Sequence, residues 1–256
     1  MNPLEHLVLF LVSLLANTFS AFSGGGAGLI QFPLLIFLGL TFSTALATHK
    51  VASVALGLGA VMRYLSTSHL DRHFVLLLLG AGLPGVILGS RIVLFIPDNI
   101  AIFSLGILTG SLGLYSIFKS DLGQNLKDKN RSIRGYIVGG IVLFFLGILN
   151  GSLTSGTGLF VTLWLVVWFG MDYQRAVAYT LILVGLFWNG AGAITLGMLA
   201  SIRWEWLPAL LLGSLLGGYL GSHLAIKHGN KLIKRSFEVV TLLISIKLIW
   251  TALSAA

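Results

Sequence analysis

Long apolar stretches alternate with short polar ones along the whole chain. A helix needs roughly 20 residues to cross about 30 Å of hydrocarbon, so the long stretches predict membrane-spanning helices. The expected helices are residues 4–22, 27–39, 45–65, 74–96, 100–118, 135–150, 158–169, 175–198, 205–226 and 236–253. Two of them, 27–39 and 158–169, are short, and each is the second of the five helices in its half of the chain.

A glycine-rich break precedes each short stretch. The first break runs from Phe22 to Gly28 (FSGGGAG) and the second from Leu149 to Gly158 (LNGSLTSGTG). The two breaks superpose on their last Gly-x-Gly, and a further glycine ends each short stretch. We interpret this match as an internal duplication. Glycine-interrupted apolar segments at matching positions of two halves indicate the substrate site of a transporter.

The composition indicates a bilayer as the solvent of this chain. Hydrophobic residues make up 56% of the 256 and charged residues 9%, whereas soluble domains carry roughly 25% charged residues. We therefore expect a multi-pass protein of a bacterial-type cell membrane. The first apolar stretch has neither a basic start nor a cleavage site, so we expect it to be retained rather than removed as a signal peptide. The chain has no cysteine, which excludes disulfides and thiolate metal sites.

The positive charges predict the topology. Five Lys and Arg lie in the polar linker 119–134 and four lie in the segment 227–235, which we interpret as a second loop. Basic loops stay in the cytoplasm, so an even number of crossings must separate these two. This placement explains the net charge of +8 without nucleic-acid binding. Each half then makes an odd net number of crossings, which inverts one half relative to the other and leaves both termini outside.

The predicted fold is an all-α integral membrane protein built from two inverted repeats. Each repeat has a glycine-broken helical hairpin, with one short half-helix, and three long transmembrane helices. Residues 1–118 form the first membrane repeat, 119–134 the cytoplasmic basic linker and 135–256 the second membrane repeat.

The two breaks are candidates for an anion site. Short helices starting near Ala27 and Gly158 present unpaired N–H groups and a partial positive charge, and anions bind there. Inverted symmetry brings the two helix ends toward the bilayer centre from opposite sides, so both can face one substrate. The alternative is that these small residues only let helices pack closely. The candidate substrate-binding residues are Ser23, Gly24, Gly25, Gly26, Ala27, Gly28, Gln31, His49, Lys50, Ser155, Gly156, Thr157, Gly158 and Asn189.

Polar residues inside predicted helices are costly and commonly functional. Lys50 either reaches the outer interface or supplies the positive charge that an anion needs. His49 either carries a proton or makes an ordinary hydrogen bond, and Gln31 and Asn189 either line a path or bridge helices. Lys247 lies near a helix end, where we expect its charged group to reach the interface. All eight acidic residues fall at a loop or a helix end, so no carboxylate for proton coupling is evident.

Two further runs of small residues have a different interpretation. Gly82 to Ser90 and Gly217 to Ser222 place small residues three and four positions apart inside full-length helices. Small residues at this spacing let a second helix approach closely. We expect both runs to be packing surfaces rather than sites.

The first break and its surroundings resemble a known family. Residues 23–35 (SGGGAGLIQFPLL), followed by 45–48 (ALAT), resemble the signature of the TauE/SafE sulfite exporters, also called 4-toluene sulfonate uptake permeases. Residues 155–158 (SGTG) and 175–180 (RAVAYT) resemble the second half of that family. The resemblance implies an integral membrane transporter of small sulfur-containing or organic anions, such as sulfite or sulfonates.

Three classes of function are compatible with the sequence. The leading one is a secondary transporter in which one repeat rocks against the other, with a small anion and the lipid bilayer as partners, no cofactor and no nucleic acid. Homo-oligomers are compatible with it. A passive anion channel is the second, and its flux would follow the anion gradient alone. An intramembrane hydrolase using Ser155 is the third, but residues 135–198 contain no histidine to activate that serine.

Overall fold

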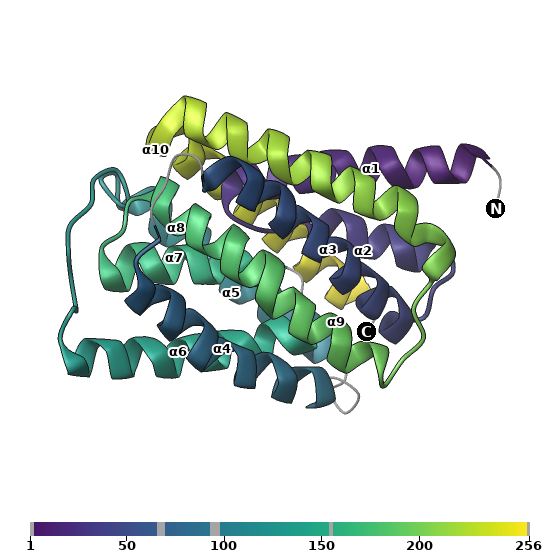
Figure 1. The fold of residues 1–256 in the computed structure, drawn as a ribbon, viewed down its shortest axis with the longest axis horizontal. Helices are drawn as coiled ribbons and strands as arrows, with labels where there is room; N and C mark the ends of the chain where they lie inside the picture. The colour runs from purple at the N-terminus through teal and green to yellow at the C-terminus, as the bar shows by residue number, and fades with distance from the viewer. Residues whose placement is uncertain (1–2, 66–69, 93–97, 154–155, 255–256) are drawn as a thin grey trace.

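The computed structural model describes residues 3–65, 70–92, 98–153 and 156–254, and this part of the chain contains helices and turns but no strand. The helices α1 to α5 span Pro3–Ser23, Gly28–Phe37, Phe42–Tyr64, Arg72–Ile92 and Asp98–Phe118. In the second half lie α6 (Ile133–Ser152), α7 (Thr157–Phe169), α8 (Tyr173–Tyr179), the π-helix η2 (Thr180–Trp188), α9 (Asn189–Gly197), the 3₁₀-helix η3 (Trp204–Trp206) and α10 (Leu207–Ser254) (Figure 1).

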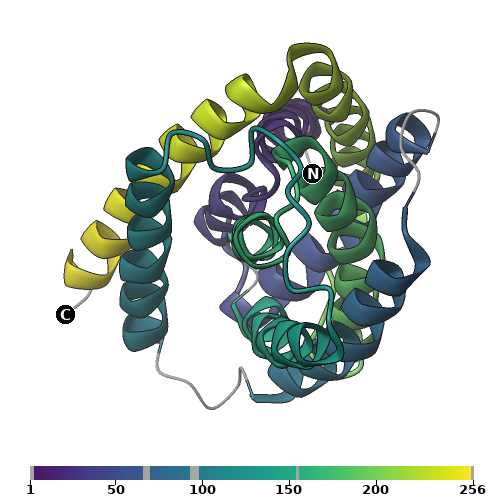
Figure 2. The same cartoon turned by 90° about the vertical axis from the view of Figure 1, so that its left-hand side faces the viewer.

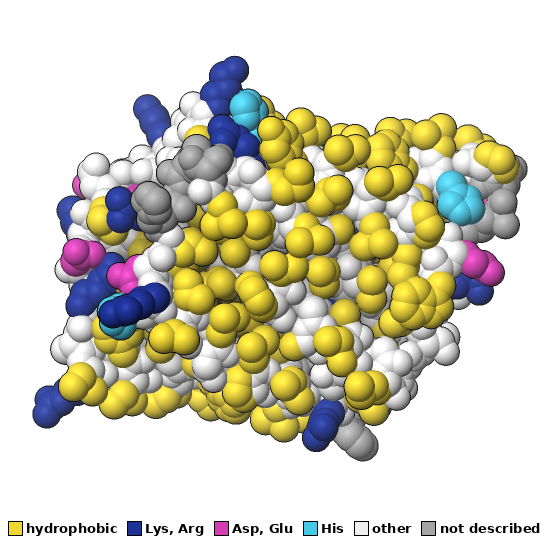
Figure 3. Space-filling view, viewed as in Figure 1, with side chains coloured by type: hydrophobic (Ala, Val, Ile, Leu, Met, Phe, Trp, Pro, Cys, Tyr) yellow, Lys and Arg dark blue, Asp and Glu magenta, His cyan; other side chains and the backbone are white. Residues whose placement is uncertain are grey.

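The molecule has the surface of a membrane protein. Within the described residues, six helical segments are long and apolar enough to cross a bilayer. Large apolar side chains such as Leu4, Leu216 and Trp250 are exposed along these helices. Apolar side chains cover the middle of the long axis, and most Lys and Arg visible in Figure 3 gather at its left-hand end. The protein is therefore a multi-pass membrane protein.

Most predicted helices are present, and the predicted loop 227–235 is much shorter than expected. Segment 227–235 is helical except at Gly229, whose φ of 73° and ψ of −177° reverse the chain within α10. Figure 1 shows α10 turning back at the left-hand end. One of the basic residues, Lys234, instead pairs with Glu238 in a largely buried contact, and Ser116 Oγ donates to Glu238 Oε1 at 2.9 Å. Glu238 thus lies inside a helix packing surface rather than at an exposed helix end.

The small-residue runs pack helices together, as predicted. Along α4, a Cβ on Gly85 would overlap the carbonyl oxygen of Phe144 in α6. Along α10, a Cβ on Gly217 would lie 2.6 Å from the carbonyl oxygen of Leu14 in α1. Helices from opposite halves of the chain therefore approach to backbone contact, which side chains larger than glycine would prevent.

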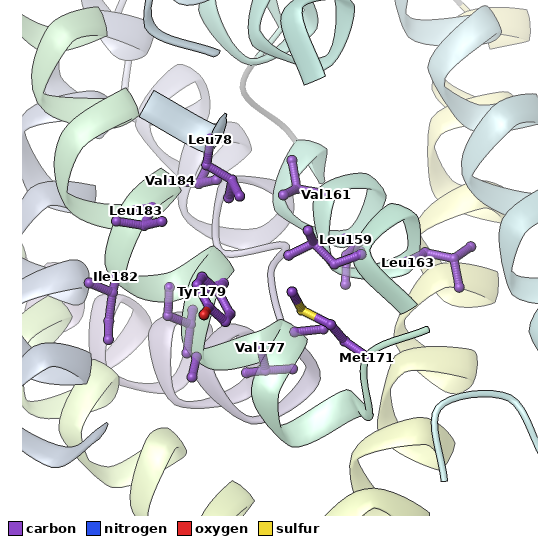
Figure 4. Packing of buried hydrophobic residues seen from close by; sticks show 14 of the residues in the cluster. Leu78, Leu159, Val161, Leu163, Met171, Val177, Tyr179, Ile182, Leu183 and Val184 are labelled. Atoms are coloured by element: carbon purple, nitrogen blue, oxygen red, sulfur yellow. The ribbon is translucent and has the colours of Figure 1, made fainter. Parts of the chain in front are cut away.

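The centre of the bundle is formed by α3, α7 and η2. A Cβ on Gly57 of α3 would lie 2.6 Å from the carbonyl carbon of Gly185 in η2, so these two helices cross at a pair of glycines. The short α7 is largely buried, and Figure 4 shows its Leu159 and Val161 among side chains of α8 and η2. By contrast, α2 exposes Phe37 at its end. Figure 2 shows that α5 and the second limb of α10 form a separate pair at one side of this centre.

Candidate functional site

The two glycine-rich breaks lie against each other in the interior. A Cβ on Gly25, between α1 and α2, would lie 2.6 Å from the backbone nitrogen of Leu159 and 2.7 Å from the carbonyl carbon of Gly158, at the start of α7. Thr162 of α7 donates its hydroxyl proton to the carbonyl oxygen of Gly24 at 2.8 Å. The duplicated segments, 130 residues apart in the chain, thus meet with no side chain between their backbones.

Glycine is required at these turns because of the backbone conformation. Gly24, Gly25 and Gly26 have φ values of 89°, 147° and 102°, and Gly156 has 76°, all in a region that L side chains rarely adopt. The carbonyl oxygen of Ser20 accepts from the N–H groups of Gly24 and Gly25 at 2.9 and 2.8 Å, which ends α1. The chain can then reverse and begin α2 with only four residues between the two helices.

A cavity of about 40 Å³ lies between the two breaks. A single water molecule needs roughly 10–15 Å³ of such space, so the cavity has room for a small cluster of atoms. Eight predicted site residues line it: Gly25, Gly26, Ala27, Gly28, His49, Thr157, Gly158 and Asn189. None of the lining residues, all within the described part of the chain, is acidic.

The residues that line the cavity form its wall. Five of the predicted substrate-binding residues do not line the cavity but lie behind this wall. Ser23 donates its hydroxyl proton to the carbonyl oxygen of Phe19 at 2.8 Å, so it stabilises its own turn. Gly24 and Gly156 shape the two breaks, and Gln31 and Lys50 hold residues of the wall in place. Ser155, the remaining candidate, lies outside the described residues.

Lys50 is fully buried and makes three hydrogen bonds to neutral oxygens. Its Nζ donates to the backbone oxygen and to Oδ1 of Asn150, both at 2.7 Å, and to Oδ1 of Asn189 at 2.9 Å. Asn150 in turn donates from Nδ2 to Oγ1 of Thr157, the first residue of α7, at 2.8 Å. The ammonium group from the first half therefore connects α3 to the start of α7 and to α9.

His49, the residue before Lys50 in α3, belongs to a second polar cluster. Its Nδ1 lies 3.0 Å from Oε1 of Gln31, and its Nε2 lies 3.2 Å from the hydroxyl of Ser53. Gln31 donates from Nε2 to Ser13 Oγ at 3.1 Å, which continues the cluster into α1. Because His49 also lines the cavity, this cluster joins the cavity wall to the interface between α1 and α2.

Four polar residues of the wall were not predicted from the sequence: Ser20, Ser53, Asn150 and Thr180. Asn150 could have been identified from the sequence, since it is a polar residue at the end of an apolar stretch and at the start of the second break. The sequence does not distinguish Ser20, Ser53 and Thr180 as site residues. Single hydroxyl residues are common in membrane helices, where they bond to the backbone or to neighbouring helices.

Comparison with known proteins finds a family and several relatives that match most of the chain. A model of the family described as Sulfite exporter TauE/SafE matches residues 9–248. The probable membrane transporter protein YfcA of Escherichia coli (strain K12) is 28% identical over 254 residues, covering 97% of this chain and 91% of the relative. A probable membrane transporter protein of Haemophilus influenzae is 27% identical, covering 95% of this chain and 94% of the relative. No solved structure matches the chain.

The family model spans nearly the whole chain, including both glycine-rich breaks and all the residues of the cavity wall. This coverage leaves only short segments at the two ends outside the match. The protein therefore belongs to the TauE/SafE sulfite exporter family and is a membrane transporter.

Proposed function

We propose that this protein is a secondary transporter of a small sulfur-containing anion, sulfite or a short sulfonate, that binds in the cavity between the two breaks. The observation that carries the proposal is the chemistry of this cavity. It is bordered by the N-termini of α2 and α7, by amide and hydroxyl side chains and, one layer behind, by the buried ammonium of Lys50. Such a set of groups favours an anion.

The binding free energy expected for an anion in this cavity suits a carrier, which must release the anion that it binds. A helix N-terminus contributes about 0.3–1 kcal/mol, or up to about 2 in a partly buried site. Each hydrogen bond to a charged group adds about 1.5–3 kcal/mol. Two helix ends and two or three such bonds therefore supply about 4–13 kcal/mol, from which the cost of binding is subtracted. Affinities in the range of about 1 µM to 1 mM correspond to 8.2 to 4.1 kcal/mol.

The packing supports alternating access by two inverted repeats. The first helix of each half packs on the fourth helix of the other half, as α1 packs on α10 and α6 on α4, while α3 and η2 cross at Gly57 and Gly185. We propose that the cavity lies on the axis that relates the two repeats. Rocking one repeat against the other would then open the cavity to each side in turn.

Both termini are expected on the extracytoplasmic side. The linker between α5 and α6 and the reversal at Gly229 lie at the end of the molecule where Lys and Arg gather, whereas α1 begins at the other end (Figures 1 and 3). A reporter fused after Ala256 that is active only in the cytoplasm should be silent, and the same reporter inserted in the linker at Asn130 should be active. Activity of the C-terminal fusion would contradict the inverted topology.

Anion binding is the direct test of the function. We expect sulfite or methanesulfonate to raise the unfolding temperature of the purified protein, because a ligand at 100 times its dissociation constant stabilises a protein by about 2.7 kcal/mol. Sodium chloride at the same ionic strength serves as the control. In liposomes, radiolabelled substrate should accumulate against its gradient when a pH or ion gradient is imposed. Absence of stabilisation by every sulfur anion tested would contradict the proposal.

A further inference from the structure

Lys50 lies beside the cavity but does not line it. Its ammonium group is enclosed, and its three protons are directed at three oxygens of Asn150 and Asn189. A Cβ on Gly192 of α9 would lie 3.2 Å from Cδ of Lys50, so the aliphatic stem is held as well. Direct contact between Lys50 and an anion in the cavity would require one of these hydrogen bonds to break.

The orientation of the two asparagine amides follows from the chemistry of lysine. An ammonium group only donates hydrogen bonds, so the amide atom that faces it must be the oxygen. The NH₂ group of each asparagine therefore lies on the other branch of the amide. In Asn150 this group donates to Thr157 Oγ1 at 2.8 Å. In Asn189, which is 9% exposed and lines the cavity, Nδ2 has no hydrogen-bond partner among the described residues.

We propose that Lys50 is a positioning residue that acts on the substrate through these asparagines. It holds both amides with their oxygens turned away from the cavity, so that Asn189 Nδ2 donates to an oxyanion in the cavity and Asn150 fixes the first turn of α7. This inference rests on the proposed function, because the oxyanion is the transported substrate. The ammonium also polarises each amide, which strengthens its NH₂ group as a donor.

The sharpest test is Asn189→Asp. An aspartate keeps an oxygen for Lys50 and adds a counter-charge, so the variant should unfold at the same temperature as the wild type or higher. It replaces the NH₂ donor with a second oxygen that carries negative charge, so sulfite or methanesulfonate should bind at least about tenfold more weakly. Loss of affinity without loss of stability is not expected of a residue that only packs.

Asn230→Asp is the matched control, since it makes the same change of charge away from the cavity. Asn230 accepts from the backbone N–H of Gln174 at 2.8 Å and donates to the carbonyl oxygen of Gln124 at 3.0 Å. This variant should bind the two anions like the wild type. If the wild type is stabilised by sulfite and Asn189→Asp is stabilised equally, the inference is wrong while the proposed function stands. If no sulfur anion stabilises the wild type, both are wrong.

A double-mutant cycle tests whether Lys50 acts through Asn189. Lys50→Met keeps an aliphatic stem but leaves the amides free to rotate, and Asn189→Leu removes the proposed donor. If Lys50 works by orienting Asn189, the double variant should bind methanesulfonate no more weakly than the weaker single variant. Binding losses that multiply would show that the ammonium attracts the anion independently, and would overturn the positioning role.

Discussion

A valine at Gly25 is expected to abolish transport while the protein still reaches the membrane. A Cβ there would lie 2.6 Å from the backbone nitrogen of Leu159, well inside contact distance, and φ is 147°. The two breaks would have to move apart, and the N-termini of α2 and α7 could no longer face one anion. Gly156→Val should have the same effect, since its φ of 76° also excludes a branched side chain. Uptake of labelled sulfite or methanesulfonate into vesicles, normalised to membrane expression, measures the loss.

Two glycine variants separate the effect on the site from backbone strain. Gly39→Ala places a Cβ at a φ of 92° with nothing within 4 Å, so it imposes strain of about 1–3 kcal/mol without displacing a neighbour. Gly158→Ala brings a Cβ to 3.2 Å from Cα of Gly25, which requires only a small shift. Transport should be retained in the first variant and reduced in the second. If the glycines serve only packing, folded Gly25→Val protein would bind anions with unchanged affinity.

The positions of the half-helices could be predicted because glycine leaves a clear signal. The duplicated Gly-x-Gly placed the starts of the short helices within a residue of Gly28 and Thr157, where α2 and α7 begin. Apolar length likewise predicted the long helices. The reversal at Gly229 was predicted as a longer loop, because a run of basic residues in a sequence does not reveal whether the segment is helical or a loop. One left-handed glycine completes that turn.

The partners of the buried charge could not be predicted from the sequence. Lys50 bonds to Asn150 and Asn189, which lie 100 and 139 positions further along the chain. From the sequence, Lys50 was a candidate to supply positive charge to the substrate. Only the fold shows that its ammonium group already donates three hydrogen bonds to neutral oxygens. In the same way, Gln31 was a candidate for the wall, and the structure places it behind His49 as a hydrogen-bond partner. Long-range polar pairs depend on how helices pack, which one sequence does not specify.

Loss of the buried ammonium should be the second large effect. Lys50→Ala leaves the oxygens of Asn150 and Asn189 without their donor in the interior, and each buried unsatisfied group costs about 1–3 kcal/mol. It also removes the ammonium group that donates hydrogen bonds to Asn150 and Asn189 of the cavity wall. We therefore expect the unfolding temperature to fall by several degrees and the affinity of the remaining folded protein for sulfite to fall at least about tenfold.

Lys247→Ala makes the same change of charge and is the control for this prediction. Lys247 lies in the second limb of α10 with its side chain exposed, and an exposed ammonium group costs little. It lines a separate, mostly apolar pocket that borders the other side of Gly25 and Gly26, but it makes no hydrogen bond to the described residues of the cavity wall. The overall positive charge falls equally in the two variants, so any long-range attraction of anions changes by a similar amount. The local contribution to anion affinity differs, because of these two lysines only Lys50 donates hydrogen bonds to residues of the cavity wall. Calorimetric titration of monodisperse protein with sulfite should therefore show wild-type affinity in Lys247→Ala. Equal losses in both variants would mean that Lys50 has no particular role at the site, and that the anion responds only to the net charge of the protein.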